Sequence, residues 1–266
     1  MTAKPPKTDR PEIDTRLFVG SVRKAMRVME AFDHEERAMT LSRIADKTGL
    51  GRSAAQRFVY TLEILGYLRR DPETLAYQLS NRAFRFVRNI LSANTTLDKS
   101  FHLLSRLAEQ TGEAVSWVER EDNEIVIIST IPSPNRTAIA LPVGARFGIL
   151  TAASGQLFLA DQSPDAVRVI FDGADAVARA RLGDQTAEAY LAMIAREKAQ
   201  GYSFTEKDFD LSSLSISAPV RDFRGRMIAA INVSILRARM QPDEVRAQLV
   251  PLLLQTAEAV SANAIG

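Results

Sequence analysis

The sequence predicts an α+β protein made of two domains of unequal size, and three observations support this. The chain has 266 residues with 46% apolar content, enough for two domains that each bury a core. Helical apolar spacing dominates the first ninety residues, whereas short β-prone runs occur toward both ends of the remainder. Residues 1–92 carry 17 Lys and Arg against 11 Asp and Glu, a net +6, and the rest carries 17 against 21, a net −4. A basic smaller part indicates contact with a polyanion, although a solvated basic face would give the same count.

Composition narrows the classes of function. The chain contains no Cys, which excludes disulfides, thiolate nucleophiles and metal sites built on Cys. His34 and His102 lie too far apart to form a local ligand motif, so we expect neither a metal nor another cofactor. No apolar run approaches the roughly 20 residues of a membrane helix, and the polar, Pro-rich start lacks the apolar core of a secretory signal. We therefore expect a cytoplasmic protein without a membrane partner.

The first part of the chain is predicted to begin with a flexible arm, residues 1–17, because it is rich in Pro and has no periodicity. A helix from Val22 to Phe32 follows, with an apolar stripe at positions 22, 25, 26, 29 and 32. Thr40 is placed to cap a second, short helix, and Gly49 is placed to end it.

The third helix carries the most informative pattern. Ser53 to Gln56 fits a Ser-x-x-Gln capping box, which would open a helix running to about Leu65. Its apolar stripe, expected to be buried, is Ala55, Phe58, Val59, Leu62 and Leu65. The residues left facing outward are Arg52, Ser53, Ala54, Gln56, Arg57, Tyr60 and Thr61. A short helix, a Gly turn and a second helix with a polar front form a helix-turn-helix, whose second helix contacts base edges. The sequence therefore predicts binding to double-stranded DNA.

Two β-prone runs around a turn at residues 71–74 predict a hairpin wing, which completes a winged helix-turn-helix domain over residues 18–80. Arg69 and Arg70, with Tyr77 opposite, are expected to reach phosphate or the minor groove. For each arginine, a solvated surface charge is the alternative. An amphipathic pattern then predicts a linker helix over residues 81–95.

Residues 96–266 are predicted to form the larger α+β domain around an antiparallel sheet. Strands are expected at residues 114–118, 124–131, 138–143, 214–221 and 227–235. Helices are expected at residues 97–111, 152–160, 164–171, 187–200 and 242–262. Strands toward both ends of the segment, with helices between them, are typical of a sheet that helices cover.

Polar side chains alternate with apolar ones on the last two predicted strands. Ser213, Ser215 and Ser217 share one face of the first strand, and Asn232 and Ser234 share one face of the second. An unpaired polar group in a core costs about 1–3 kcal/mol. This polar face is therefore expected to meet solvent, another chain or a polar ligand.

The order of short motifs along the chain resembles the IclR family of transcriptional regulators, from Ser21 to the end. The motifs are Ser21 to Met26, Leu41 to Ala45, Gly66 to Leu68, Val143 to Arg146, Thr151 to Ala160, Gly201 to Ser203, Ser217 to Asp222, Gly225 and Asn232 to Ser234. The resemblance implies a GAF-like effector-binding domain at the C-terminus that takes a small-molecule metabolite, often a small or aromatic carboxylic acid. It also implies a homodimer or homotetramer on a partly palindromic operator.

The resemblance further implies which residues face the effector: Ala153, Ser154, Thr205, Ser215, Asn232 and Ser234. The alternation of polar residues independently favours the last three. A helix N-terminus near Ala153 and Ser154 would present free N–H groups to a carboxylate. Trp117, the only Trp, is expected either to cover such a pocket or to lie in the core. Thr205 stands where an acidic residue is frequent in the family, so the identity of the effector is not carried over.

Other interpretations stay open. Ser154 could be the nucleophile of a small-molecule hydrolase with His102 as its base, although the Gly of a nucleophile elbow is missing at position 152. Glu206, Asp208 and Asp210 could hold a divalent metal or form a solvated acidic loop. A DNA-binding protein that responds to no ligand is a further class. We expect no catalytic residues, and the sequence leaves repression and activation undecided.

Overall fold

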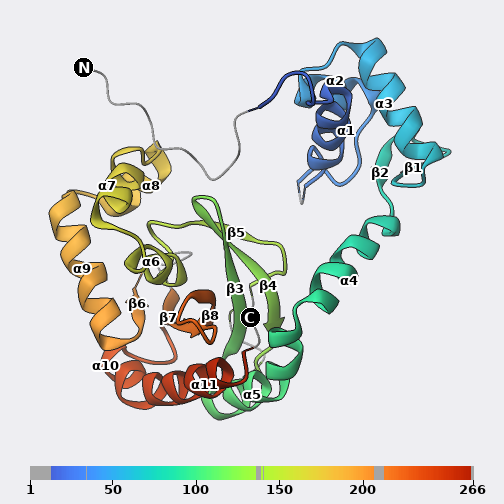
Figure 1. Cartoon of the computed structure of the whole chain (residues 1–266). Coiled ribbons are helices and arrows are strands. Elements are labelled where there is room, and N and C mark those ends of the chain that lie inside the picture. The colour runs from blue at the N-terminus through green and yellow to red at the C-terminus, as the bar shows by residue number, and fades with distance from the viewer. Residues whose placement is uncertain (1–12, 34, 136–138, 140, 207–212, 265–266) are drawn as a thin grey trace, which may run out of the picture. The chain divides into compact units, whose positions relative to one another are not determined.

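The computed structural model describes residues 13–33, 35–135, 139, 141–206 and 213–264, which divide into two compact units between Ala93 and Asn94 (Figure 1). Each unit has its own apolar core. In the N-terminal unit the core gathers around Val28, Ile44 and Val59. In the C-terminal unit one large cluster lies around Val118, Leu159 and Tyr190.

The N-terminal unit has the predicted winged helix-turn-helix order of elements. Its described elements are α1 (Gly20–Glu30), α2 (Leu41–Thr48), α3 (Arg52–Ile64), β1 (Leu68–Arg70), β2 (Tyr77–Leu79), a 3-10 turn (Asn81–Ala83) and α4 (Phe84–Ala93). Strands β1 and β2 pair antiparallel, with Arg69 opposite Gln78. The hairpin wing and the following helix are thus confirmed.

Two helix ends in this unit lie where their capping residues predict them, and a third does not. The Thr40 hydroxyl accepts from the backbone N–H of Arg43, and Gly49 ends α2 with a φ of 65° in the left-handed region. The capping box predicted at Ser53 is wrong, because Gly51 is the N-cap of α3 and no side chain caps it. Ser53 therefore lies one residue inside the helix.

The apolar stripe predicted for α1 is wrong in part. Val28 is fully buried and packs in the core, whereas Val22 and Met26 are 58% and 51% exposed. Helix α1 contacts α2 and α3 through the side that bears Val28. Leu65, expected inside, is also exposed. Apolar residues therefore remain on the surface of this small unit.

The C-terminal unit is built on a six-stranded sheet in the order β5-β4-β3-β8-β7-β6, with every neighbouring pair antiparallel. Its strands are β3 (Ala114–Glu121), β4 (Glu124–Ile131), β5 (Arg146–Gly148), β6 (Ser203–Thr205), β7 (Ser213–Arg221) and β8 (Met227–Leu236). Its helices are α5 (Thr95–Thr111), α6 (Ala153–Ala160), α7 (Pro164–Asp172), α8 (Ala176–Leu182), α9 (Ala187–Gln200), α10 (Pro242–Glu244) and α11 (Val250–Ala262).

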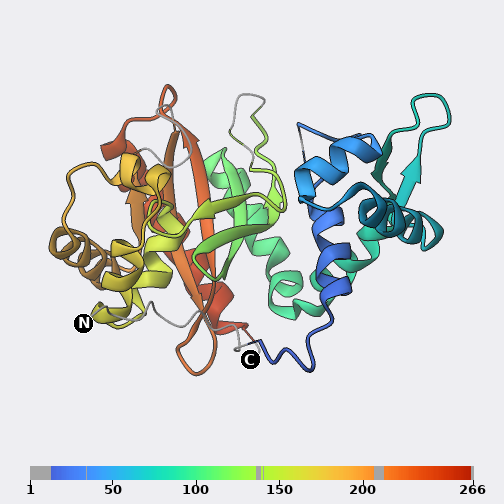
Figure 2. The ribbon, with the colours of Figure 1, turned by 90° about the horizontal axis from the view of Figure 1, so that it is seen from above.

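Helices cover both faces of this sheet. Helix α6 contacts β7 and β8 on one face, and α7 and α9 pack around it. Helices α5 and α11 lie side by side and contact β3 and β7 on the other face. Figure 2 shows the yellow and gold helices on one side of the sheet. The α+β class and the antiparallel sheet are confirmed.

Several elements of the C-terminal unit differ from the prediction. Helix α8 and strand β6 were not expected, and the third strand lies at Arg146–Gly148 rather than at residues 138–143, part of which falls outside the described residues. The terminal helix contains a π-helical segment, Val245–Leu249, just before Pro251. Pro has no N–H to donate, so a wider turn ahead of it accommodates the missing hydrogen bond.

Candidate functional site

The front of α3 presents polar side chains to solvent. Arg52, Ser53, Gln56, Arg57, Tyr60 and Thr61 are exposed, and Ala54 is half-buried. The helix is held from behind by Ala55, Val59 and Leu62, which are buried at spacings of four and three. Arg52 donates to the Ser42 hydroxyl at 3.2 Å, and the Thr61 hydroxyl donates to the carbonyl of Arg57. Within the described residues no hydrogen bond holds the side chains of Gln56 and Arg57, so both are available to a partner.

The wing carries two exposed arginines and one buried tyrosine. Arg69 donates to the Gln78 side chain at 3.0 Å. The expectation that Tyr77 contacts DNA is wrong, because Tyr77 is only 9% exposed and packs in the core. Its backbone also forms a β-bridge with Met39. The guanidinium of Arg70 lies 5.5 Å above the Tyr77 ring. Tyr77 therefore supports the wing and Arg70 instead of facing outward.

Ion pairs fix α2 against the segment before it. Arg43 contacts Glu36, and Lys47 contacts both Glu36 and Asp33. The Arg43 guanidinium lowers the pKa of Glu36 to about 2, and the Lys47 ammonium lowers the pKa of Asp33 to about 2. These contacts hold the first helix of the helix-turn-helix in place.

The register of the larger sheet places polar residues in one row across four strands. Ser116 on β3 is opposite Asn232 on β8, which is opposite Ser217 on β7, which is opposite Ser203 on β6. A second row joins Ser234, Ser215 and Thr205. Both rows lie on the α6 side, because the Ser203 hydroxyl donates to the Gln156 side chain of α6. We call these residues and the N-terminus of α6 the polar face.

The polar face is buried, and only part of it is satisfied by its own residues. Ser217 donates to the side-chain oxygen of Asn232 at 2.8 Å, and the Asn232 amide donates to Ser234 at 3.0 Å. The hydroxyls of Ser215 and Thr205 are buried, stand opposite each other in register and have no hydrogen-bond partner among the described residues. Buried polar groups are almost always paired in folded proteins, so two neighbouring exceptions call for an explanation.

Helix α6 begins at this face. Ala153 and Ser154 occupy its first turn, both at 2% exposure or less, and no side chain among the described residues caps the N–H groups there. The helix is held close to the preceding loop, because a Cβ on Gly155 would clash with the carbonyl of Ile149. The Tyr190 hydroxyl donates to the carbonyl of Leu150 and holds the same loop.

The structure brings together all but one of the residues expected around an effector. Trp117 is the exception, and the expectation that it could cover the pocket is wrong. It is opposite Ile231, so it lies on the face of the sheet that α5 and α11 cover, away from Asn232 and Ser234. It is 1% exposed, and its indole N–H donates to Glu119 at 2.8 Å. The structure supports the other expectation, that Trp117 lies in the core.

A buried acid near the polar face was not foreseen. Glu197 of α9 is 5% exposed. The Ser203 hydroxyl, which carries one hydrogen, lies 2.7 Å from the Gln156 oxygen and 2.9 Å from one oxygen of Glu197. The other Glu197 oxygen has no partner within the part of the chain that the structure describes. Burial raises the pKa of Glu197 to about 7. The signal that could have identified it is the helical spacing of Tyr190, Ile194 and Glu197. The structure shows that these three residues form the buried side of α9.

Among the described residues neither the enzymatic nor the metal alternative finds support. His102 is exposed on α5, which covers one face of the sheet, whereas Ser154 lies beneath the other face, so they cannot form a nucleophile and base pair. Glu206 contacts Arg237, while Asp208 and Asp210 lie outside the described residues. Among the described residues no group of three or more His, Asp or Glu side chains could hold a metal ion.

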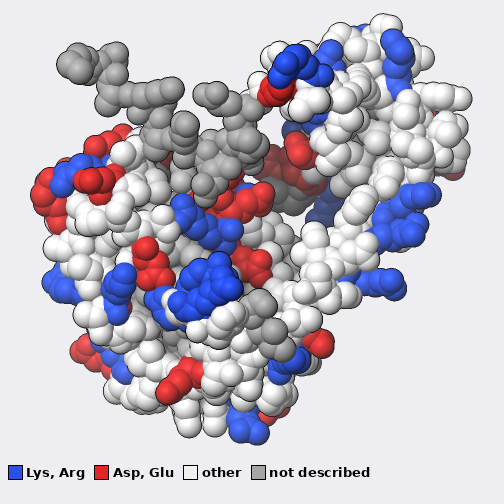
Figure 3. Space-filling model, in the orientation of Figure 1, with Lys and Arg blue, Asp and Glu red and all other residues white. Residues whose placement is uncertain are grey.

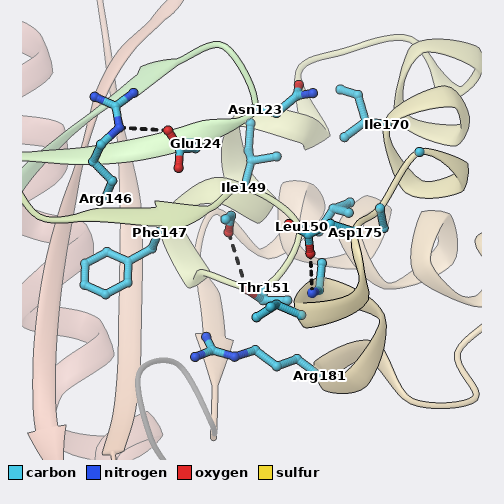
Figure 4. A pocket seen from close by; sticks show the side chains of 15 residues that line it. Asn123, Glu124, Arg146, Phe147, Ile149, Leu150, Thr151, Ile170, Asp175 and Arg181 are labelled. Carbon is cyan, nitrogen blue, oxygen red and sulfur yellow. Dashed lines mark hydrogen bonds and ion pairs between the residues drawn. The ribbon is translucent and has the colours of Figure 1, made fainter. Parts of the chain in front are cut away.

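A separate cleft of about 420 Å³ lies at the β5 edge of the sheet, between the β3–β4 turn and helices α7 and α8 (Figure 4). Its rim carries charges of both signs, including the ion pair between Arg146 and Glu124. Ile149 and Leu150 line it, and the same loop packs against Gly155 at the start of α6. The cleft thus shares a wall with the polar face.

Comparison with known proteins decides the family. Residues 90–262 match the family described as bacterial transcriptional regulator IclR C-terminal, and residues 21–72 match the IclR helix-turn-helix domain. The chain belongs to the IclR family. It is 27% identical over 89% of its length to the Pca regulon regulatory protein of Pseudomonas putida, covering 81% of that protein. It is 25% identical over 92% of its length to the p-hydroxybenzoate hydroxylase transcriptional activator of Acinetobacter baylyi, covering 92% of it.

Solved structures of the IclR family share the fold. An IclR transcriptional regulator from Alicyclobacillus acidocaldarius superimposes with a TM-score of 0.81 at 23% identity, over 92% of this chain and 98% of that one. An IclR homologue from Microbacterium hydrocarbonoxydans, complexed with 4-hydroxybenzoate, gives 0.77 at 20% identity, over 91% and 98%. The two family matches given above show that the chain is a DNA-binding transcriptional regulator and not an enzyme. Within the described residues no helix is long and apolar enough to span a bilayer.

Proposed function

We propose that this regulator binds a small organic acid on the polar face of its C-terminal unit, and that binding changes its affinity for an operator. The observation that carries the proposal is the pair of buried hydroxyls of Thr205 and Ser215, unpartnered among the described residues, beside the uncapped start of α6. A ligand that accepts hydrogen bonds would satisfy both groups. Ligand binding shifts operator affinity only by its differential affinity for two states of the protein, typically about 1–3 kcal/mol.

The chemistry of the polar face favours an anion. Ser154, Ser215, Asn232 and Thr205 offer hydroxyl and amide donors, and the first N–H groups of α6 add a partial positive charge. A carboxylate accepts several such hydrogen bonds at once. Two relatives named for the Pca regulon and for p-hydroxybenzoate hydroxylase, and a neighbour that binds 4-hydroxybenzoate, make that acid the first candidate to test.

For DNA, we propose that Gln56 and Arg57 contact base edges while Arg52, Arg69 and Arg70 contact phosphates. The support is their exposure on the front of α3 and on the wing. Gln pairs with adenine and Arg with guanine through two hydrogen bonds each, whereas a phosphate contact adds affinity without sequence preference. The proposed surface also includes Ser53, Ala54, Tyr60 and Thr61.

We also propose that the regulator acts as a homodimer or homotetramer. Val22 and Met26 on α1, and Phe84, Val87 and Ile90 on α4, are large apolar side chains between 39% and 68% exposed. Apolar groups gathered on helices of one small unit favour burial against a second copy. Analytical ultracentrifugation tests this, and Phe84→Glu should shift the population toward monomer.

Calorimetric titration of 4-hydroxybenzoate, with benzoate and a non-aromatic acid of similar size alongside, tests the ligand proposal. We expect binding to the wild type that weakens about two- to tenfold in Ser215→Ala and in Thr205→Val, because each removes one neutral hydrogen bond. Val has nearly the same shape as Thr, so the second variant removes the hydroxyl without opening a cavity. Binding that is equal in wild type and both variants would move the site away from the polar face.

A ligand-independent regulator is the alternative, and the same measurements separate the two. If no small acid binds, while footprinting shows protected DNA upstream of neighbouring genes, the DNA-binding part stands and the effector part fails. If the acid binds but leaves operator affinity unchanged, the polar face is a binding site without a regulatory role.

A further inference from the structure

We infer that α4, the helix that leaves the winged helix-turn-helix, is itself a DNA-backbone-binding element, with Arg85 and Arg88 as its phosphate contacts. This role rests on the DNA binding of the N-terminal unit and extends it beyond α3 and the wing. The partner is the sugar-phosphate backbone of the same duplex. The contact would be independent of sequence.

The charge pattern of this segment is one-sided. Between Thr74 and Leu97 the chain has no Asp or Glu, and its only charged residues are Arg82, Arg85 and Arg88. All three are exposed, and none forms an ion pair within the described residues. By contrast, Arg146 of the C-terminal unit is paired with both Glu121 and Glu124. Figure 3 shows blue side chains along the α4 part of the surface with no red beside them.

Helical geometry gathers these charges on one side. Arg85 and Arg88 lie three positions apart on α4, so they share one side of the helix, and Arg82 precedes them in the 3-10 turn that leads into it. Together the three span about 9 Å along the helix axis. The exposed apolar residues of α4, which include Phe84 and Val87, lie on a different arc of the same helix. We call Arg82, Arg85 and Arg88 the basic arc. A second copy of the chain can cover the exposed apolar residues while the basic arc remains free.

The basic arc is anchored at the base of the wing. Phe86 stacks on Tyr67 with ring centroids 5.8 Å apart and planes at 9°, and the guanidinium of Arg82 lies 5.5 Å from the same ring. Tyr67 immediately precedes Leu68, where strand β1 begins. The Ser80 hydroxyl also donates to the carbonyl of Gly66. The start of α4 is therefore fixed to the element that carries Arg69 and Arg70.

The charge density of DNA fits this spacing. A duplex carries about one negative charge per 1.7 Å of its axis, so a stretch of about 9 Å offers roughly five phosphate charges. Two arginines that continue the line of charge from the wing would each neutralise one phosphate and release its counterion. The alternative is that these arginines bind acidic residues of the C-terminal unit instead of DNA phosphates. The experiment separates the two partners.

The experiment measures the affinity of the full chain for a random-sequence duplex between about 50 and 200 mM salt, because phosphate contacts need no operator. The double variant Arg85→Gln/Arg88→Gln should have a log–log salt slope shallower by about 1.8 for each chain bound. Arg85→Lys/Arg88→Lys should keep the wild-type slope. The matched control is Lys99→Gln/Arg106→Gln, which removes two exposed charges from α5 and should leave the slope unchanged.

Four results overturn the inference. The slope of the α4 variant could equal that of the wild type, or the α5 control could lose as much slope as the α4 variant. The α4 variant could bind DNA more tightly, which would show that the arc holds the acidic unit instead. A wild-type chain that binds no duplex would overturn the DNA-binding assignment as well, so the two failures are distinguishable. Matching thermal unfolding curves for all variants confirm that only surface charge has changed.

Discussion

The two units of this regulator place their polar side chains in opposite environments. The N-terminal unit displays Gln56 and Arg57 in solvent, whereas the C-terminal unit buries Ser215 and Asn232 at 2% exposure or less. Exposed polar groups bond to water in the absence of a partner and so do not lower stability. A buried polar group without a hydrogen-bond partner lowers the free energy of unfolding until a ligand bonds to it. The candidate DNA surface therefore lies outside a complete core, while the candidate effector site is built into a core.

The substitution expected to cost the most stability tests how tightly the start of α6 is packed. Gly155→Ala would place a Cβ 2.8 Å from the carbonyl carbon of Ile149 and closer still to its oxygen, and neither backbone segment can yield cheaply. We expect a loss of about 3 kcal/mol or more in the free energy of unfolding of the C-terminal unit. Urea unfolding followed by the fluorescence of Trp117, which lies in that unit, measures it.

The matched substitution in the other unit is Gly49→Ala. Gly49 has a φ of +65°, but nothing among the described residues lies within 4 Å of its Cβ position. The cost should be about 1–2 kcal/mol from backbone strain alone, without a change in the Trp117 transition. Equal effects of the two substitutions on Trp117 would contradict the close packing of α6 and its loop.

The stability of the two units should depend on pH in opposite ways. Burial raises the pKa of Glu197 from an ordinary 4.5 to about 7, so between these values the folded protein keeps a proton that the unfolded chain has lost. The stability of the C-terminal unit should therefore fall as pH rises, by about 3 kcal/mol across this window. Glu197→Gln should remove that dependence. A wild-type free energy of unfolding that stays flat across this pH window would show that Glu197 is ionised throughout.

The N-terminal unit should respond to pH with the opposite sign. The pKa values of Asp33 and Glu36 lie near 2 because Lys47 and Arg43 stabilise their charged forms. Their contribution is present at neutral pH and is lost as pH falls from about 4 toward 2. Circular dichroism of Glu36→Gln against wild type at acid and at neutral pH separates this contribution from that of Glu197.

Much of the contrast between the units could be predicted from the sequence, and the missing parts have physical reasons. Local capping rules identified Thr40 and Gly49 correctly but placed the start of α3 at Ser53 instead of at Gly51. The face of the sheet on which Trp117 lies depends on its register with Ile231, far along the chain. Alternation revealed the polar row of β7 and β8, but only the packing of α6 shows that this row is buried.

The exposed side chains of α3 and of the wing should affect DNA binding in two different ways. Gln56→Ala and Arg57→Ala should each reduce discrimination at one base position by about 1–3 kcal/mol. Arg69→Ala and Arg70→Ala should weaken binding to all sequences alike and make the salt dependence shallower by about 0.9 each. Selection of binding sites from a random duplex library measures the base preference, and a salt titration measures the slope. If the wing variants altered the preferred sequence, the division between base and phosphate contacts would be wrong.

The last and smallest difference is expected between two serines of the polar face. Ser217 and Ser215 lie on the same strand and the same face, and both are fully buried. Ser217 donates to Asn232, whereas the Ser215 hydroxyl has no partner among the described residues. Ser217→Ala should therefore cost about 1 kcal/mol in the free energy of unfolding, because it leaves the Asn232 oxygen unsatisfied. Ser215→Ala should cost nothing or stabilise the unit slightly, since it removes a buried group that is left unsatisfied. Urea unfolding without ligand compares the pair at equal volume change. A Ser215→Ala variant that loses as much stability as Ser217→Ala would mean that the polar face is a satisfied core, and the case for a ligand there would fall with it.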